Sequence, residues 1–175
     1  QQVSKRHAEI IRDGMAPFRW LLRDLDSSNC TFVNCAKTIL RQDRIVILGS
    51  RRYRLRVSNA LPVAPNDTGT SLADLQGSVT DACPTLVETI ASGTPHEIQL
   101  RGPHLTLGRP RCGNHIELDD PLIARQHATI SRLPSGEWQV TALPSRNGVW
   151  AQIKLIALSA SCRFQCGEQR FLFTI

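Results

Sequence analysis

Short apolar runs recur along most of the 175-residue chain, separated by turns rich in Gly, Pro, Asn and Asp. Within these runs the residues alternate between apolar and polar or are β-branched, which is the pattern of a half-buried strand. Residues 3–11 and 20–24, for example, flank an Asp-Gly turn and predict a hairpin. Many short strands with turns about every 8–12 residues predict an all-β chain of the β-sandwich class.

The predicted strands fall into two groups. The first group lies at 3–11, 20–24, 32–33, 44–48 and 53–57. The second group lies at 97–101, 105–107, 115–118, 126–132, 137–142, 149–151, 154–156, 162–166 and 169–174. The first two members of the second group are predicted to form a hairpin over Gly102-Pro103.

The stretch between the groups, residues 58–95, has a different composition. It is rich in Pro, Gly, Ser and Thr, which predicts a linker. A short helix at 81–91 is the one element that we predict within it.

The two groups contain similar residues in the same order. Matching residues lie 118 positions apart: Trp20 and Trp138, Asn29 and Asn147, Phe32 and Trp150, Gly49 and Gly167. His7-Ala8 and His127-Ala128 are 120 positions apart, and the two-residue difference falls in a predicted surface turn, where insertions are tolerated. A repeat this long indicates duplicated domains. We therefore predict two β-sandwich domains, at 1–57 and 96–175, joined by the linker.

The net charge of +6 is carried by eighteen arginines and three lysines. This bias has two explanations: a general codon preference, or selection for guanidinium groups that bind phosphate and other planar anions. Nucleic acid is a partner that the charge alone permits. The basic residues are scattered and no nucleic-acid-binding motif is present, so we do not favour it.

The six cysteines show no Cys-x-x-Cys spacing, and the histidines show no metal-ligand spacing. We expect free, buried thiols in a reducing, cytoplasmic compartment, with a Cys30–Cys35 disulfide as the alternative. No cofactor or metal is expected. No apolar run approaches the roughly 18 residues of a membrane helix. Because the chain begins with Gln directly at a strand, we expect it to be a fragment or a processed chain.

One line of motifs in the second group carries the most information. Gly108-Arg109 follows a predicted strand, His127-Ala128 begins another, and Ser145-Arg146-Asn147-Gly148 comes about twenty residues later. This line resembles the forkhead-associated (FHA) domain, a phosphothreonine-binding β-sandwich. The second group covers the whole family pattern, whereas the first covers only its later part.

The resemblance implies a phosphopeptide site in the second domain. Arg109 matches the phosphate-binding arginine, Asn147 matches the asparagine that bonds the ligand main chain beyond the phosphothreonine, and Gly148 permits the turn that presents it. Arg125 and Arg146 are auxiliary candidates. Ala124 stands where the family has a phosphate-binding serine, which removes one donor.

The resemblance implies a second, less complete site in the first domain. Ser4 matches the phosphate-binding serine, Lys5 is a candidate to assist it, and Asn29 matches the peptide-binding asparagine, whereas Cys30 replaces the family glycine. The matching arginine and the first strands are missing. We expect about 25 upstream residues to supply them, or another chain to add strands to the open edge.

The favoured function is a non-catalytic adaptor that recognises phosphothreonine on a protein, with a Ser/Thr kinase or its substrate as partner. Linker threonines are candidate intramolecular ligands: Thr68, Thr70, Thr80, Thr85, Thr89 and Thr94. The alternative is a structural scaffold, for example in bacterial secretion or envelope machinery, whose sandwiches have lost phosphate dependence. We do not expect an enzyme, because the resemblance implies that His7 and His127 support loops and no nucleophile adjoins them.

Overall fold

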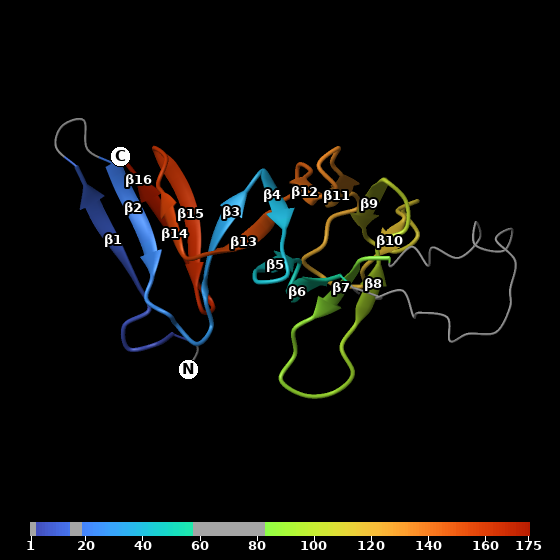
Figure 1. The fold of residues 1–175 in the computed structure, drawn as a ribbon, viewed down its shortest axis with the longest axis horizontal. Coiled ribbons are helices and arrows are strands. Elements are labelled where there is room, and N and C mark those ends of the chain that lie inside the picture. Colours follow the sequence, from blue (N-terminus) through green and yellow to red (C-terminus); the bar gives the residue numbers. More distant parts are fainter. Residues whose placement is uncertain (1–2, 15–18, 58–82) are drawn as a thin grey trace, which may run out of the picture.

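The computed structural model describes residues 3–14, 19–57 and 83–175, which form strands and loops without helices (Figure 1). The all-β prediction is therefore confirmed, and no helix in these ranges is long and apolar enough to span a membrane. Residues 3–57 contribute the strands β1 (Ala8–Asp13), β2 (Arg19–Asp24), β3 (Thr31–Cys35), β4 (Lys37–Leu40), β5 (Ile45–Leu48) and β6 (Arg51–Arg56). Residues 83–175 contribute β7 (Thr85–Glu88), β8 (Glu97–Gln99), β9 (His104–Gly108), β10 (Ile116–Glu117), β11 (Ala128–Arg132), β12 (Trp138–Ala142), β13 (Val149–Ile153), β14 (Leu155–Ala157), β15 (Ser161–Cys166) and β16 (Gln169–Thr174).

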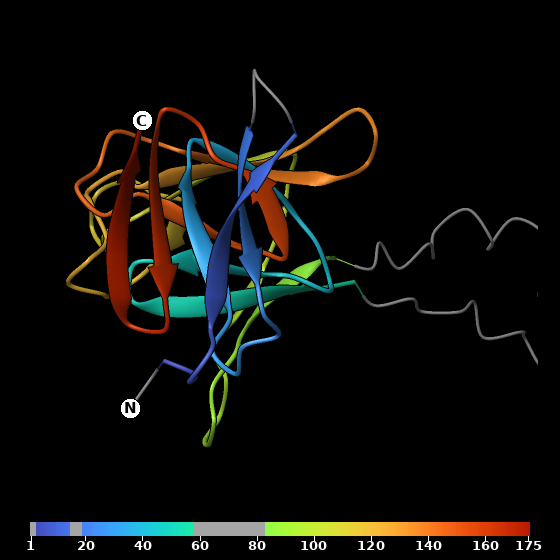
Figure 2. The same cartoon turned by 90° about the vertical axis from the view of Figure 1, so that its left-hand side faces the viewer.

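These strands form three sheets. Their orders are β1-β2-β14, β10-β9-β11-β12-β4 and β16-β15-β3-β13-β5-β6-β7-β8. Figure 1 shows β1, β2 and β14–β16 at one end of the molecule, which we call the small lobe. Strands β7–β12 lie at the other end and, together with β4–β6, form the large lobe. Strands β3 and β13 lie between the lobes. Figure 2 looks onto the small lobe, with β15 and β16 beside β1 and β2.

Each lobe has its own core. In β11 the buried Ala128 and Ile130 alternate with the less buried Thr129 and Ser131, as expected for a strand with one face on a core. The large-lobe core includes Leu48, Tyr53, Leu86, Leu107, Ile130 and Val140. The small-lobe core includes Leu22, Val33, Ile153, Leu158 and Phe164. A third cluster lies on the long sheet where the lobes meet: Phe32, Ile45, Ile47 and Trp150.

Both lobes take strands from both predicted domains. In the large lobe, β4 of the first range pairs with β12 of the second, and β6 pairs with β7. In the small lobe, β14 pairs with β2 and β15 pairs with β3. The ranges 1–57 and 96–175 therefore do not each form one sandwich, because the later strands of each range pair with the earlier strands of the other.

The exchange of strands is symmetric. Val33 of β3 lies opposite its repeat counterpart Ala151 of β13 in an antiparallel ladder. On the outer sides, Phe164 pairs with Val33 just as Val46 pairs with Ala151. These pairings place an approximate two-fold axis between β3 and β13, the relation that an isologous contact between two like units produces.

Two other local predictions are wrong. The predicted helix at 81–91 contains β7, which pairs with β6 on one side and β8 on the other, and its β-branched Thr85 and Val87 favour a strand. Residues 83–95 of the predicted linker thus include a strand, and residues 58–82 lie outside the described ranges. The predicted hairpin at 97–107 does not form either, because β8 pairs with β7 while β9 pairs with β10 and β11 in another sheet. The six cysteines are free, but only Cys166 is buried and the other five are half-buried, so the prediction of buried thiols holds for Cys166 alone.

The small lobe is less covered than the large one. Ile130 of β11 is 0% exposed in the large-lobe core, whereas its counterpart Ile10 in β1 is 42% exposed. Likewise Tyr53 of β6 is 0% exposed and its counterpart Phe171 of β16 is 42% exposed. Among the described strands, β1 has only β2 as a neighbour and β16 has only β15. The outer edges of the small lobe are therefore open among the described strands.

Candidate functional site

The large-lobe loops that carry the sequence motifs surround one cavity of about 840 Å³. Arg109 follows β9, and Arg146 and Asn147 precede β13, so the fold brings together three of the residues predicted from the sequence. We call this space the arginine cavity. The described residues that line it are Arg109, Pro121, Leu122, Ile123, Ala124, Arg146, Asn147, Arg163 and Arg170, none of which is acidic.

Hydrogen bonds to the loop 121–124 fix the two central side chains. Arg109 donates from Nε to the carbonyl oxygen of Ile123 at 3.1 Å. Asn147 donates from Nδ2 to the carbonyl oxygen of Leu122 at 2.9 Å. These bonds leave the other guanidinium N–H groups of Arg109 and the amide oxygen of Asn147 available within the described structure, which is the donor and acceptor set that an anion on a peptide requires.

His127 supports this arrangement from below and is fully buried. Its Nδ1 accepts a hydrogen bond from the amide of Ala124 at 3.2 Å, and its Nε2 lies 3.1 Å from the carbonyl oxygen of Gly148. An amide can only donate and a carbonyl can only accept, so the neutral ring carries its proton on Nε2. His127 thus joins two loops of the cavity, and its structural role agrees with the sequence-based interpretation.

Protonation of His127 at Nδ1 would break its bond with Ala124, so stability should fall in acid. Burial lowers the pKa of His127 below its ordinary value of 6.5, against the opposing effects of Gly148 and Asp120. The unfolded chain therefore gains this proton at a higher pH than the folded chain. Its stabilising contribution is complete above pH 6.5 and decreases as the pH falls below that value towards the folded pKa.

Urea unfolding at about pH 7.5 and about pH 5.5 measures this effect, with His127→Gln as the comparison because its amide stays neutral. The loss of unfolding free energy between the two pH values should be larger in the wild type than in the variant. Equal losses in both proteins would contradict the role assigned to His127.

Asp120 attaches the same loop to the first range of the chain. Its carboxylate accepts hydrogen bonds from the amide of Ser50 at 2.9 Å and from the amide of Leu122 at 2.8 Å. Burial raises the pKa of Asp120, but the hydrogen bonds from Ser50 and Leu122 outweigh this effect and lower it overall. The contact with Ser50 follows from the strand exchange, which brings the turn between β5 and β6 beside this loop.

Gly148 is required by both conformation and space. Its φ angle is 62°, and a Cβ atom there would lie 2.4 Å from Nδ2 of Asn34. Its amide donates to Oγ of Ser145 at 3.1 Å, so the serine fixes its own loop. Gly148 therefore shapes the turn that presents Asn147.

Arg125 lies apart from the other predicted residues of the second range. It lines a neighbouring cavity of about 570 Å³ with Arg111 and Cys112, and the two cavities share only Ala124. Arg125 therefore does not line the arginine cavity, and its role as an auxiliary contact stays a prediction.

The candidate site of the first range is assembled only in part. Ser4 and Lys5 line a cavity of about 610 Å³ whose walls include the apolar Ile10 and Phe171. Oγ of Ser4 accepts a hydrogen bond from the amide of Ser28 at 3.3 Å, which brings the loop of Asn29 beside it. Asn29 itself is not among the residues that line this cavity. Two loops thus meet here around a space that is open and largely apolar.

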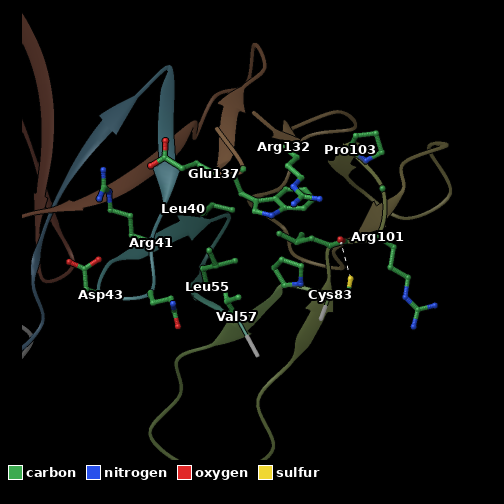
Figure 3. A pocket seen from close by; sticks show the side chains of 16 residues that line it. Leu40, Arg41, Asp43, Leu55, Val57, Cys83, Arg101, Pro103, Arg132 and Glu137 are labelled. Carbon is green, nitrogen blue, oxygen red and sulfur yellow. Dashed lines mark hydrogen bonds between the residues drawn. The ribbon is translucent and has the colours of Figure 1, made fainter. Parts of the chain in front are cut away.

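Another cavity, of about 1050 Å³, lies at the other end of β9, beside Gly102 and Pro103 (Figure 3). Its walls combine Leu40, Leu55 and Trp138 with charged side chains of both signs, which Figure 3 shows around its rim: Arg41, Asp43, Arg101, Arg132 and Glu137. The described residues contain no cluster suited to a metal ion. The mixed charges favour no particular anion at this end.

Arg163 and Arg170 are cavity residues that sequence reasoning missed. They come from β15 and β16 and reach the arginine cavity only because the long sheet continues from the small lobe through β3 to β13. Arg170 lies 118 positions after Arg52, at the offset of the repeat, but nothing in its spacing points to Asn147.

The model of the FHA domain family matches residues 1–51 and 105–167. No curated protein matches the chain.

Proposed function

Because the chain belongs to the FHA domain family, we propose that it binds phosphothreonine-containing segments of proteins at the arginine cavity. The family consists of non-catalytic interaction domains. The observation that carries the proposal is the meeting of Arg109 and Asn147 on one cavity whose described lining has four arginines and no carboxylate.

The chemistry of the cavity suits such a ligand. Phosphothreonine carries about −1.5 to −2 charges and three strong acceptor oxygens, which a guanidinium binds through parallel N–H bonds. Asn147 provides an amide for the ligand main chain. Leu122, which is 36% exposed, offers apolar surface to the threonine γ-methyl group, whose burial contributes about 1–3 kcal/mol to the preference over serine.

The test is titration of the whole chain with a phosphothreonine peptide library and its unphosphorylated counterparts. Arg109→Ala should abolish phosphate-dependent binding. Ala124→Ser should strengthen it about tenfold, because a hydroxyl adds one donor to the phosphate. Arg132→Ala, at the other end of the large lobe, is the matched control and should bind as the wild type does. Absence of phosphate-dependent binding by the wild type and by Ala124→Ser would refute the proposal.

A scaffold without phosphate dependence is the second candidate, and Ala124 is the observation that favours it. In that function Arg109→Ala would leave assembly with partners unchanged.

The partner proposed for the first function is a phosphorylated protein, such as a Ser/Thr kinase or its substrate. Of the threonines considered as internal ligands, Thr85 is buried in β7, whereas Thr89 and Thr94 are exposed. We retain these two as candidates.

The symmetric registers of β3 and β13 support the further proposal that the chain contains two FHA-like copies. In this proposal the first copy contributes Ser4, Lys5 and Asn29 to a second binding site. That site would need an arginine from another segment to bind phosphate as the arginine cavity does.

A further inference from the structure

The arginine cavity spans the junction between the two lobes. Arg109 and Arg146 stand on loops of the large lobe, whereas Arg163 and Arg170 belong to β15 and β16 of the small lobe. A ligand that lies along the cavity therefore passes from the motif residues onto the outer strands of the other lobe.

The Arg170 guanidinium is held in place by neutral groups. Its Cζ atom lies 4.7 Å from the centroid of the Trp150 ring, and its Nε donates to Oε1 of Gln165 at 3.0 Å. Nε1 of Trp150 in turn donates to the carbonyl oxygen of Asn147 at 2.7 Å. The stacked, hydrogen-bonded arginine is thus preorganised beside Asn147, and its outer N–H groups have no partner among the described residues.

The positive charge of the cavity exceeds what one phosphate neutralises. None of the four arginines forms an ion pair within the described residues, and no acidic side chain lines the cavity. Phosphothreonine supplies at most about two negative charges. About two guanidinium charges therefore remain for a second anion.

We propose that the cavity binds two anionic groups of one peptide: the phosphothreonine at Arg109 and a second anionic residue at Arg163 and Arg170. The second group follows the phosphothreonine in the peptide, because Asn147, which would bond the main chain beyond it, is joined to Arg170 through Trp150. Glutamate, aspartate and a second phosphorylated residue share this chemistry. The inference rests on the proposed function and defines the ligand class more narrowly.

Calorimetric titration of the whole chain with three peptides tests it. Each peptide contains one phosphothreonine, and the positions after it carry alanine, glutamate or a second phosphothreonine. For the wild type the second anion should tighten binding about tenfold, as a charge-assisted contact to arginine does. The double variant Arg163→Gln with Arg170→Gln should lose this gain, so that it binds the alanine, glutamate and doubly phosphorylated peptides with similar affinities. Arg132→Gln should retain the gain.

Arg163→Gln alone separates binding from folding. Among the described residues the Arg163 side chain forms no hydrogen bond or ion pair, whereas Arg170 stacks on the buried Trp150. It should lose part of the gain, and Arg163→Lys should restore part of it. Equal affinity of the wild type for all three peptides would overturn the inference while leaving the proposed function intact. Failure of every phosphopeptide to bind would overturn both. If the double variant lost the same factor of affinity for all three peptides relative to the wild type, the inference would also be overturned.

Discussion

Residues 1–57 and 83–175, produced as two separate polypeptides, are expected to associate into one folded complex, and neither is expected to fold alone. The reason is that strand pairings between the two ranges hold both lobes together: β2 with β14, β3 with β13 and β15, β4 with β12, β5 with β13, and β6 with β7. A separate piece would expose these strand edges and the core residues that the other piece covers.

Co-expression followed by size-exclusion chromatography with light scattering measures the association. Amide NMR spectra of each piece and of the mixture report folding, and the intact chain is the control. Two pieces that each gave dispersed spectra and eluted independently would contradict the exchanged arrangement and would favour two self-contained sandwiches.

Trp150→Ala is expected to lower the free energy of unfolding by about 3–5 kcal/mol, the usual cost of removing a large buried aromatic side chain. The Trp150 side chain is 3% exposed and packs in the cluster between the lobes. The change also removes the hydrogen bond to Asn147 and the surface on which Arg170 stacks. Ligand affinity at the arginine cavity should therefore fall even under conditions in which the variant remains fully folded.

Phe32→Ala is the matched control. Phe32 is the counterpart of Trp150, is fully buried in the same cluster and contacts the Arg52 guanidinium in the same way, at 5.2 Å from the ring centroid. It makes no contact with Asn147. Urea unfolding should show similar losses for both variants, whereas phosphopeptide affinity, measured at low temperature where both remain folded, should fall only for Trp150→Ala. Equal losses of affinity would show that Trp150 acts through general packing.

The local parts of the structure could be predicted because their signals lie close together in the sequence. The hairpin of β1 and β2 follows from an Asp-Gly turn between two apolar runs; it forms as predicted, with β1 beginning later than predicted, at Ala8. The loops that present Arg109 and Asn147 follow from the Gly-Arg and Asn-Gly motifs. His127 could be assigned a supporting role because its neighbours contained no group for it to activate.

The exchange of strands could not be predicted in this way. β5 and β15 occupy equivalent positions in the repeat, so their alternation fits β13 and β3 equally well. Which partner each strand takes is decided by tertiary packing, which no local pattern records. The same limit applies to β7, where contact with β6 overrides a weak preference for helix, and to Arg163 and Arg170, which reach the cavity only through the long sheet.

The sharing of β13 has a consequence for energetics. Asn147 lies just before this strand, and β13 pairs with β3 on one side and with β5 on the other. A peptide that contacts Arg109 and Arg170 together binds only when the lobes hold their native positions, so its binding and their cohesion are thermodynamically linked. Such a ligand stabilises the junction between the lobes. It raises the free energy needed to separate them by the same amount that the intact junction adds to the free energy of ligand binding.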